Sequence, residues 1–250
     1  MSVHVRNVGP MDVILVPGFW LDGSSWDPVV PPLVAAGHRV HPVTLPGVED
    51  GADRAAHGGL GLSDWVAAVV DVVDRVEGPV VLVGHSGGGP VVPAVVDARP
   101  DRVARAVYAD SWPTGRGFVI NDELPVEGHS VPLPPWEFFD DRDLVDLDEA
   151  LRARFRAVAR PIPARVASDP LELSDGTGRY GVPVTVITCE YPSGEIRRYI
   201  ESGVPVFAEL GAIEDVTFVD LPTGHWPQLT RPQELGAAIL DAVERPTTTT

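Results

Sequence analysis

The stretch PVVLVGHSGG, residues 79–88, decides the fold class expected for this chain. Its first half is an unbroken apolar run rich in valine, as in a strand buried on both faces of a parallel sheet. Its second half has the pattern G-x-S-x-G, in which glycines two positions before and after the serine let a strand and the next helix approach closely. The stretch therefore predicts a strand, a strained turn that presents Ser86 as a candidate nucleophile, and a helix.

Apolar runs of the same kind recur on both sides of this turn. Together they predict six strands, over residues 12–16, 39–44, 79–83, 105–109, 183–188 and 216–221. Amphipathic segments between them predict helices over residues 26–36, 63–76, 87–98 and 232–243, with Ser63 as the N-cap of the second. Strand and helix in regular alternation predict an α/β fold with a mostly parallel, doubly wound sheet.

The alternation stops between residues 112 and 180, which begin rich in proline and glycine and then predict a charged helix over residues 147–158. A connection of roughly 70 residues is too long for a plain loop in a compact domain. We therefore expect a lid inserted into a core formed by residues 1–111 and 181–246, with residues 247–250 as a frayed tail. A poorly ordered surface excursion is the alternative for the inserted segment.

The charge of the chain limits its partners. Its 250 residues include 19 basic and 36 acidic side chains, a formal charge of −17, and every basic residue is arginine. Such a chain repels nucleic acid and anionic membranes, and without lysine it cannot form a Schiff base or a P-loop. We expect a small-molecule substrate as the partner, and a homodimer remains open.

The single cysteine, Cys189, cannot form an internal disulfide or a cysteine-rich zinc site, and we expect it to be a small buried residue. Residues 1–12 lack the basic and apolar regions of a signal peptide, and no apolar run reaches the roughly 18 residues of a spanning helix. These observations favour a cytoplasmic protein without a membrane partner.

A serine nucleophile requires a base and donors for an oxyanion. His225 follows the last strand in the sequence LPTGHW and is the candidate base. The backbone amides of Gly87, directly after the serine, and Phe19, in the loop after the first strand, are the candidate donors. The other six histidines are assigned to the N-terminal segment, to surface loops or, for His85, to support of the turn: His4, His38, His41, His57, His85 and His129.

The order of these parts resembles the α/β-hydrolase family. VILVPGFW, GHSGG and LPTGHW match its oxyanion loop, nucleophile turn and histidine loop, and the likeness covers about residues 10–245. Residues 17–47 are similar to the small branch that includes plant methyl-ester esterases, hydroxynitrile lyases and many uncharacterised actinobacterial hydrolases. The resemblance implies a sheet trimmed at its N-terminal edge and a helical lid. The absence of lysine argues against hydroxynitrile lyase activity.

The acid of the triad departs from the family pattern, which places an aspartate in the loop after the penultimate strand. Here that loop reads TCEYPS and offers Glu190, whereas Asp110 ends the preceding strand, a site that some family members use instead. A carboxylate at either position could orient the imidazole of His225. We favour Asp110 and keep Glu190, or a serine–histidine dyad, as alternatives.

Aromatic residues in and near the inserted segment are candidates for a hydrophobic substrate pocket, although they could equally seal the segment against the core. The candidate substrate-binding residues are Trp20, Trp112, Trp136, Phe138, Phe139 and Trp226, with Phe118 and Phe155 of similar character. Asp140, Asp141 and Asp143 are expected to form a solvated face.

The leading hypothesis is a serine hydrolase of the carboxylesterase type that cleaves an ester-type bond of a small, fairly apolar molecule, without metal or organic cofactor. Lactonase, thioesterase and perhydrolase activities use the same residues and remain open. Ser86 argues against the aspartate-nucleophile enzymes of this fold. The alternative is a catalytically weak or inactive protein that binds a small molecule, because a misplaced acid would lower turnover and leave the pocket intact.

Overall fold

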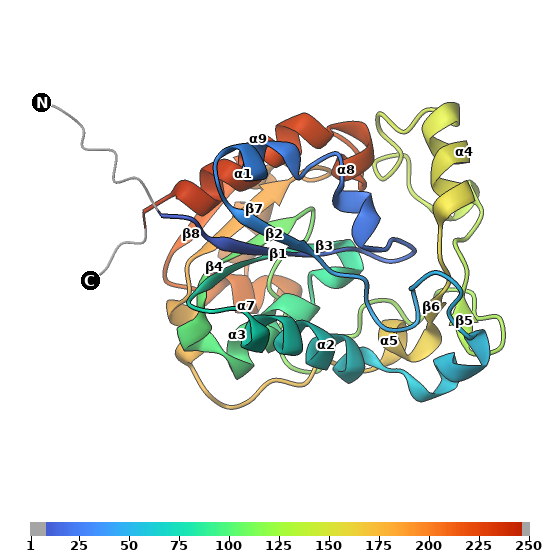
Figure 1. Ribbon diagram of the computed structural model, residues 1–250, viewed down its shortest axis with the longest axis horizontal. Helices are drawn as coiled ribbons and strands as arrows, with labels where there is room; N and C mark the ends of the chain where they lie inside the picture. The colour runs from blue at the N-terminus through green and yellow to red at the C-terminus, as the bar shows by residue number, and fades with distance from the viewer. Residues whose placement is uncertain (1–8, 247–250) are drawn as a thin grey trace, which may run out of the picture.

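The computed structural model describes residues 9–246, so His4 and the tail at residues 247–250 lie outside the described residues. One six-stranded parallel sheet has the order β2 (Arg39–Pro42), β1 (Asp12–Val16), β3 (Val80–His85), β4 (Val103–Ala109), β7 (Val184–Thr188) and β8 (Val216–Asp220). Helices cover both faces of this sheet (Figure 1). The α/β fold class expected from the sequence is confirmed.

The register of the sheet sets where the functional loops meet. Val16 pairs with Gly84, Gly84 pairs with Tyr108, and Ala109 pairs with Ile187. Because the strands are parallel, the loops that follow them all leave from one edge of the sheet. The four central strands are buried as predicted, whereas β2 and β8 are edge strands and partly exposed.

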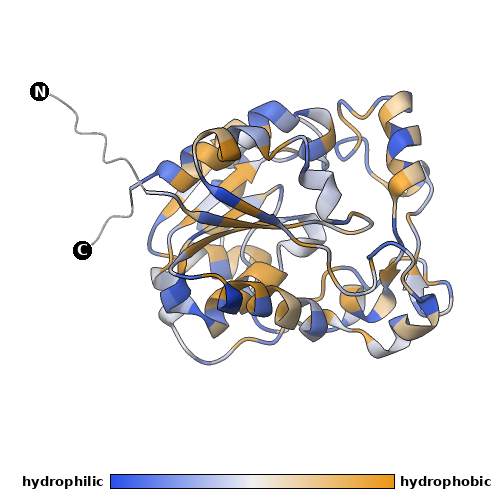
Figure 2. Cartoon of the chain, viewed as in Figure 1, coloured by the Kyte–Doolittle hydropathy of each residue, from blue (hydrophilic) through white to orange (hydrophobic). Residues whose placement is uncertain are grey.

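The two faces of the sheet carry separate hydrophobic layers. Helices α1 (Pro31–Ala35) and α9 (Pro232–Glu244) pack together on one face, and α2 (Leu62–Arg75) and α3 (Val91–Ala98) pack together on the other. Figure 2 shows hydrophobic segments in the sheet and in the helices on both sides of it, as burial of both faces requires. The remaining helices are α4 (Glu149–Val158), α5 (Ala164–Ser168), α6 (Ser193–Glu201), α7 (Ala208–Gly211) and α8 (Pro227–Thr230).

Several predicted helix boundaries are wrong for local reasons. The helix expected over residues 26–36 is a 3₁₀ turn at Gly23–Trp26 and a short α1, because the prolines at 28, 31 and 32 remove backbone donors. The N-cap of α2 is Gly61 rather than Ser63, and its amide donates to the Asp64 side chain at 2.7 Å. The helix expected from Gly87 begins with a 3₁₀ turn at Ser86–Gly88.

Residues 112–180 pass beyond the edge of the sheet where the strands end (Figure 1). They contain α4, α5 and an antiparallel pair of two-residue strands, β5 (Ser130–Val131) and β6 (Ile162–Pro163). Asp148 caps α4 by accepting from the amide of Leu151 at 2.8 Å. The segment buries apolar residues of its own: Leu147, Phe155, Ile162 and Val166 are at most 2% exposed.

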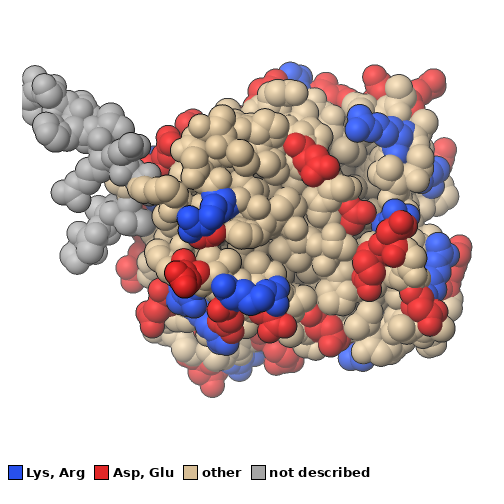
Figure 3. All heavy atoms as spheres, in the orientation of Figure 1, with Lys and Arg blue, Asp and Glu red and all other residues tan. Residues whose placement is uncertain are grey.

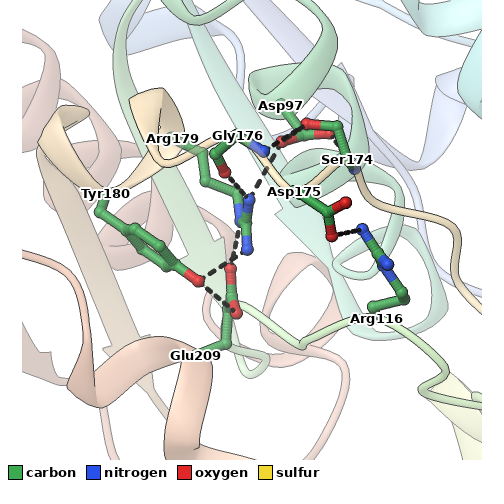
Figure 4. Close-up of polar contacts among 8 residues, drawn as sticks. All are labelled: Asp97, Arg116, Ser174, Asp175, Gly176, Arg179, Tyr180 and Glu209. Carbon is green, nitrogen blue, oxygen red and sulfur yellow. Dashed lines mark hydrogen bonds and ion pairs between the residues drawn. The ribbon is translucent and has the colours of Figure 1, made fainter.

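A polar cluster joins the end of this segment to the core (Figure 4). Arg179 forms ion pairs with Asp97 of α3 at 3.1 Å and with Glu209 of α7 at 2.5 Å, and the three side chains are each at most 10% exposed. The hydroxyl of Tyr180 also lies 3.3 Å from Glu209. One guanidinium therefore pairs with two nearly buried carboxylates where the chain re-enters the sheet.

Among residues 9–246, no helix combines the length and the apolar character that a membrane-spanning segment needs.

Candidate active site

Ser86 lies at the tight turn after β3 and has a φ of 49°. This left-handed conformation is strained for a residue with a side chain and persists where the surrounding structure enforces it. A Cβ atom on Gly84 would lie 2.6 Å from Cγ2 of Val92, and one on Gly88 would collide with the carbonyl oxygen of Pro17. Both glycines of the motif are therefore required by the close approach of strand, turn and helix, as the sequence predicted.

His225 links the serine to a carboxylate. Its Nε2 lies 2.6 Å from Oγ of Ser86, and its Nδ1 lies 2.7 Å from Oδ2 of Asp110. The main chain of His225 is held as well, since its amide donates to the carbonyl of Asp143 at 2.9 Å. Ser86, His225 and Asp110, which come from three different loops, thus form one continuous hydrogen-bonded chain.

His85 supports this arrangement from beneath the turn. Its Nε2 donates to the carbonyl oxygen of His225 at 2.6 Å, and its Nδ1 accepts from the side chain of Gln228 at 2.9 Å. Burial lowers the pKa of His85 to about 3, so the ring is neutral at physiological pH. This neutral ring fixes the histidine loop, as expected for the variable position of the motif.

Asp110 is fixed by the loop after the neighbouring strand. It has a φ of 44° at the end of β4, and its Oδ1 accepts from the amides of Cys189 and Glu190 at 3.0 and 3.1 Å. These two bonds leave Oδ2 free to face His225. Cys189 is buried, and burial together with the nearby carboxylates raises the pKa of its thiol, so it stays uncharged.

Glu190 also reaches the imidazole. Its Oε1 lies 3.3 Å from Nδ1 of His225, so the structure brings both candidate acids to one ring nitrogen. Burial alone would lower the pKa of His225, but the hydrogen bonds and charges of Asp110 and Glu190 raise it well above the ordinary value. Asp110 has the shorter contact and the more complete set of hydrogen bonds.

Asp143 corrects the expectation that all three aspartates of the inserted segment are solvated. It is half-buried on the wall of the cavity next to Ser86, and Asp140 also lines this wall, whereas Asp141 is exposed. Burial and the neighbouring Glu190 raise the pKa of Asp143 to about 7. Nothing in the local sequence distinguishes Asp143 from Asp140 and Asp141, because all three belong to one acidic run.

The loop after β1 lies against the serine turn. A Cβ on Gly18 would lie 2.6 Å from Nδ1 of His85, and one on Gly87 would collide with the ring of Phe19. Within residues 9–246, the amides of Phe19 and Gly87 donate no hydrogen bond to the protein. Trp20 has a φ of 64°, and its indole N–H donates to the carbonyl of Val131 at 3.2 Å. Two unpaired amides on touching turns suit an oxyanion hole.

A cavity of about 390 Å³ opens beside Ser86 and His225. Of the expected aromatic residues, Trp20, Trp112, Phe118, Phe138 and Phe139 line it. The sequence did not single out the remaining lining residues of the inserted segment, which follow no helical or strand period: Thr114, Ile120, Asn121 and Leu124.

Trp136 and Trp226 do not line this cavity, contrary to expectation. Together with Phe155 they form an aromatic cluster behind it, with ring centroids 5.9 Å apart for Trp136 and Phe155 and 5.2 Å apart for Phe155 and Trp226. Trp226 is 1% exposed. The two indoles instead pack between the inserted segment and the histidine loop.

His57 was expected in a surface loop and is instead buried. It is 1% exposed and lies 2.9 Å from the carbonyl oxygen of Gly47 and 2.8 Å from the hydroxyl of Ser130. Both ring nitrogens are therefore satisfied, and the residue has a structural role. His38 is also buried, at 5% exposed.

The cluster of Asp110, Glu190 and His225 brings metal-binding atom types within 4.8 Å of one another. However, Nε2 of His225 faces a serine hydroxyl and Nδ1 faces carboxylate oxygens, so both nitrogens are used in hydrogen bonds. The arrangement suits proton transfer between a hydroxyl and an imidazole.

Comparison with known proteins agrees with the fold. Residues 13–238 match the model of the alpha/beta hydrolase family, and the chain belongs to this family. It is 27% identical over 249 residues to the pyrethroid hydrolase of Sphingobium wenxiniae, covering 94% of this chain and 88% of that protein. It is 28% identical over 183 residues to the carbendazim hydrolyzing esterase of a Nocardioides species, covering 72% and 71%.

Solved structures show the same fold at lower identity. An extracellular α/β-hydrolase from a Paenibacillus species superposes with a TM-score of 0.72 at 22% identity, covering 93% of this chain and 99% of that one. A methylesterase from Arabidopsis gives a TM-score of 0.72 at 20% identity, covering 93% and 98%. The relatives are hydrolases and esterases, and this chain is a hydrolase of their family.

Proposed function

We propose that the protein is a serine hydrolase that cleaves an ester-type bond of a small, fairly apolar substrate through an acyl-enzyme on Ser86. The observation that carries this proposal is the chain of short hydrogen bonds from Ser86 through His225 to Asp110 at the wall of a cavity of about 390 Å³. A serine with a positioned imidazole and an orienting carboxylate is the arrangement used for acyl transfer.

The reaction would follow from these contacts. Nε2 of His225 takes the proton as Oγ of Ser86 attacks the ester carbonyl, and the amides of Phe19 and Gly87 stabilise the oxyanion. The imidazolium, stabilised by Asp110, then protonates the leaving alcohol as the tetrahedral species collapses to an acyl-enzyme. Water, deprotonated by His225, attacks the acyl group in the same way, and the departing Oγ regains its proton.

Residues 112–180 would form the lid of this site, with the core supplied by the chain on either side. The segment contributes Trp112, Phe118, Phe138 and Phe139 to the cavity wall, so it would determine which acyl or alcohol groups fit. Relatives named for pyrethroid and carbendazim hydrolysis also point to small organic substrates. Lactonase, thioesterase and perhydrolase activities stay within this mechanism.

The binding-protein alternative rested on a misplaced acid. The contact of 2.7 Å between Asp110 and His225 removes that reason, so we favour catalysis.

A fluorophosphonate probe tests the assignment directly, because it reacts with an activated serine. We expect intact mass spectrometry to show one adduct on the wild-type protein and on Ser168→Ala, a control at an exposed serine of α5, and none on Ser86→Ala. Turnover of 4-nitrophenyl esters should disappear in the same variant. Equal labelling of Ser86→Ala would show that the nucleophile is another residue.

A further inference from the structure

Residues 143–146 of the inserted segment bond directly to the main chain of the histidine loop. The amide of His225 donates to the carbonyl of Asp143 at 2.9 Å. The amide of Gly224 donates to the carbonyl of Val145 at 3.1 Å. Because the imidazole is carried by this main chain, the two bonds help to determine where its ring lies. The inserted segment therefore supports the candidate base of the site as well as lining the cavity.

The two stretches of chain approach so closely that the histidine loop needs a glycine. A Cβ atom on Gly224 would lie 2.6 Å from the carbonyl oxygen of Val145 and would collide with that of Asp143. The φ of Gly224 is not in the left-handed region, so the neighbouring chain, and not the backbone conformation, requires glycine here. The glycine before His225 thus allows the contact between the loop and the inserted segment.

The side chain of Asp146 adds polar bonds to the same contact. Its Oδ2 accepts from the hydroxyl of Thr223 at 3.2 Å, and from Nη2 and Nε of Arg231 at 2.9 and 3.1 Å. Thr223 is 3% exposed and directly precedes Gly224, and Arg231 is the N-cap of α9. One carboxylate oxygen therefore connects the inserted segment to the chain on both sides of His225.

The backbone of Asp146 also suits this position. It has a φ of 63°, a left-handed conformation that aspartate and asparagine adopt more readily than most residues with a side chain. Asp146 follows Val145, whose carbonyl accepts from the loop, and precedes Leu147, which is 2% exposed. Asp146 is not among the residues that line the cavity, so any effect on the reaction passes through the histidine loop.

An exposed ion pair by itself adds little to stability. The side chains of Asp146 and Arg231 are 37% and 44% exposed. A pair of the same kind joins Asp74 of α2 to Arg99 at the end of α3, at 2.8 Å and with side chains 42% and 39% exposed. The two pairs differ in what they hold, because only that of Asp146 lies beside main-chain bonds to the loop of the base. Asp74 therefore provides a matched control.

We propose that Asp146 is a positioning residue, which holds residues 143–146 against the histidine loop and so keeps Nε2 of His225 within reach of Ser86. The inference rests on the proposed function, in which His225 takes the proton of Ser86. His85 holds the carbonyl of His225 from the core side, and the inserted segment holds its amide. The base is therefore fixed only when the inserted segment is in place, and residues 143–146 do not open as a lid.

Three substitutions of Asp146 separate its side chain from its backbone. Asparagine keeps an acceptor oxygen and tolerates a left-handed φ, glycine keeps only the backbone freedom, and alanine loses both. Displacement of a catalytic group by about 1 Å can lower a rate about 10²-fold. We therefore expect kcat for a neutral 4-nitrophenyl ester to fall about tenfold in Asp146→Gly and further in Asp146→Ala, with KM changed less than about twofold. Asp146→Asn should restore most of kcat, and Asp74→Ala should match the wild type.

Thr223→Val removes the partner of Asp146 on the side of the loop and keeps the shape of the side chain. If Asp146 acts through Thr223, the double variant Asp146→Gly/Thr223→Val should lose clearly less kcat than the product of the two single losses. Losses that multiply would overturn the proposal. A loss that appears in KM while kcat is unchanged would also overturn it, because the segment would then act on substrate binding.

Hydrogen exchange followed by NMR measures the same contact without turnover. The amides of Gly224 and His225 should be protected in the wild type and in Asp74→Ala, and should lose protection in Asp146→Gly and Asp146→Ala. Unchanged exchange at both amides in these two variants would overturn the proposal. If Ser86 does not turn over esters, the proposed function fails in the kinetic assay, whereas exchange at these amides still decides whether Asp146 holds the histidine loop.

Discussion

Asp110 adopts a left-handed backbone conformation at the end of β4, where its two carboxylate oxygens face in different directions. Oδ1 accepts from the amides of the loop after β7, and Oδ2 accepts from His225. The sequence identified Asp110 and Glu190 as competing acids, but only the adjacency of β4 and β7 shows that the main chain of one candidate orients the side chain of the other.

Substitution of Asp110 by asparagine should lower kcat for a neutral ester by roughly 10²–10⁴ and change KM little. The amide would lose the charge that stabilises the imidazolium and would favour the wrong tautomer of His225. Steady-state kinetics with 4-nitrophenyl esters measures this, and circular dichroism controls for folding. If Asp110→Asn loses less than twofold while Glu190→Gln loses the larger factor, then Glu190 is the orienting acid.

The turn around Ser86 requires glycine where strand and helix pack closely together. Gly84 has no room for a methyl group, because its Cβ would lie 2.6 Å from Val92 and 3.0 Å from the Cα of Gly89. Gly84→Ala should therefore cost about 1–3 kcal/mol of unfolding free energy, as overpacking does in cores. Gly194→Ala in α6, where no atom lies within 4 Å of the added Cβ, is the control and should not be destabilised. Urea denaturation measures both variants, and equal stabilities would contradict the crowding argument.

The ion pairs of Arg179 hold the end of the segment at residues 112–180 against α3 and α7. Arg179→Met would leave Asp97 and Glu209 as unpaired, nearly buried carboxylates, and should cost about 2–4 kcal/mol. Arg116→Met breaks an ion pair with Asp175 in which the arginine side chain is 50% exposed and the aspartate side chain 97% exposed. It should cost less than about 0.5 kcal/mol of unfolding free energy. Thermal unfolding compares the two, and similar losses would mean that burial of the Arg179 cluster (Figure 4) is not what matters.

Elements with a strong periodic signal were predictable, and contacts between distant elements were not. The motif around Ser86 and the loop of His225 follow from local sequence, because each lies directly after a predicted strand of the sheet. The place of Asp143 and the loss of Trp136 from the cavity wall depend on how the inserted segment folds back over the sheet edge. That segment has only two-residue strands and short helices, so its sequence carried little periodic information.

The whole molecule carries a charge of −17, and acidic groups are spread over the face seen in Figure 3 with arginines among them. The cavity wall also has more acidic than basic side chains. Among the described residues that line it are Asp110, Asp140, Asp143 and Glu190, and no arginine. A negative surface with an acidic site lowers the local concentration of anions and raises their cost of entry. Substrates with a free carboxylate should therefore be poor ones, although an apolar group of the same length would fit.

Two esters of equal acyl length test this at the molecular scale: 4-nitrophenyl hexanoate and mono-(4-nitrophenyl) adipate. At low ionic strength we expect kcat/KM for the adipate to be at least about tenfold lower than for the hexanoate. The reason is that its terminal carboxylate is repelled during approach and inside the cavity. Added salt shortens the Debye length to about 3 Å at 1 M, so the long-range part of the difference should shrink as salt rises. Hexanoate serves as the control for general salt effects. Equal rates at low salt, or a ratio that salt does not change, would mean that the charge of the molecule does not select its substrates.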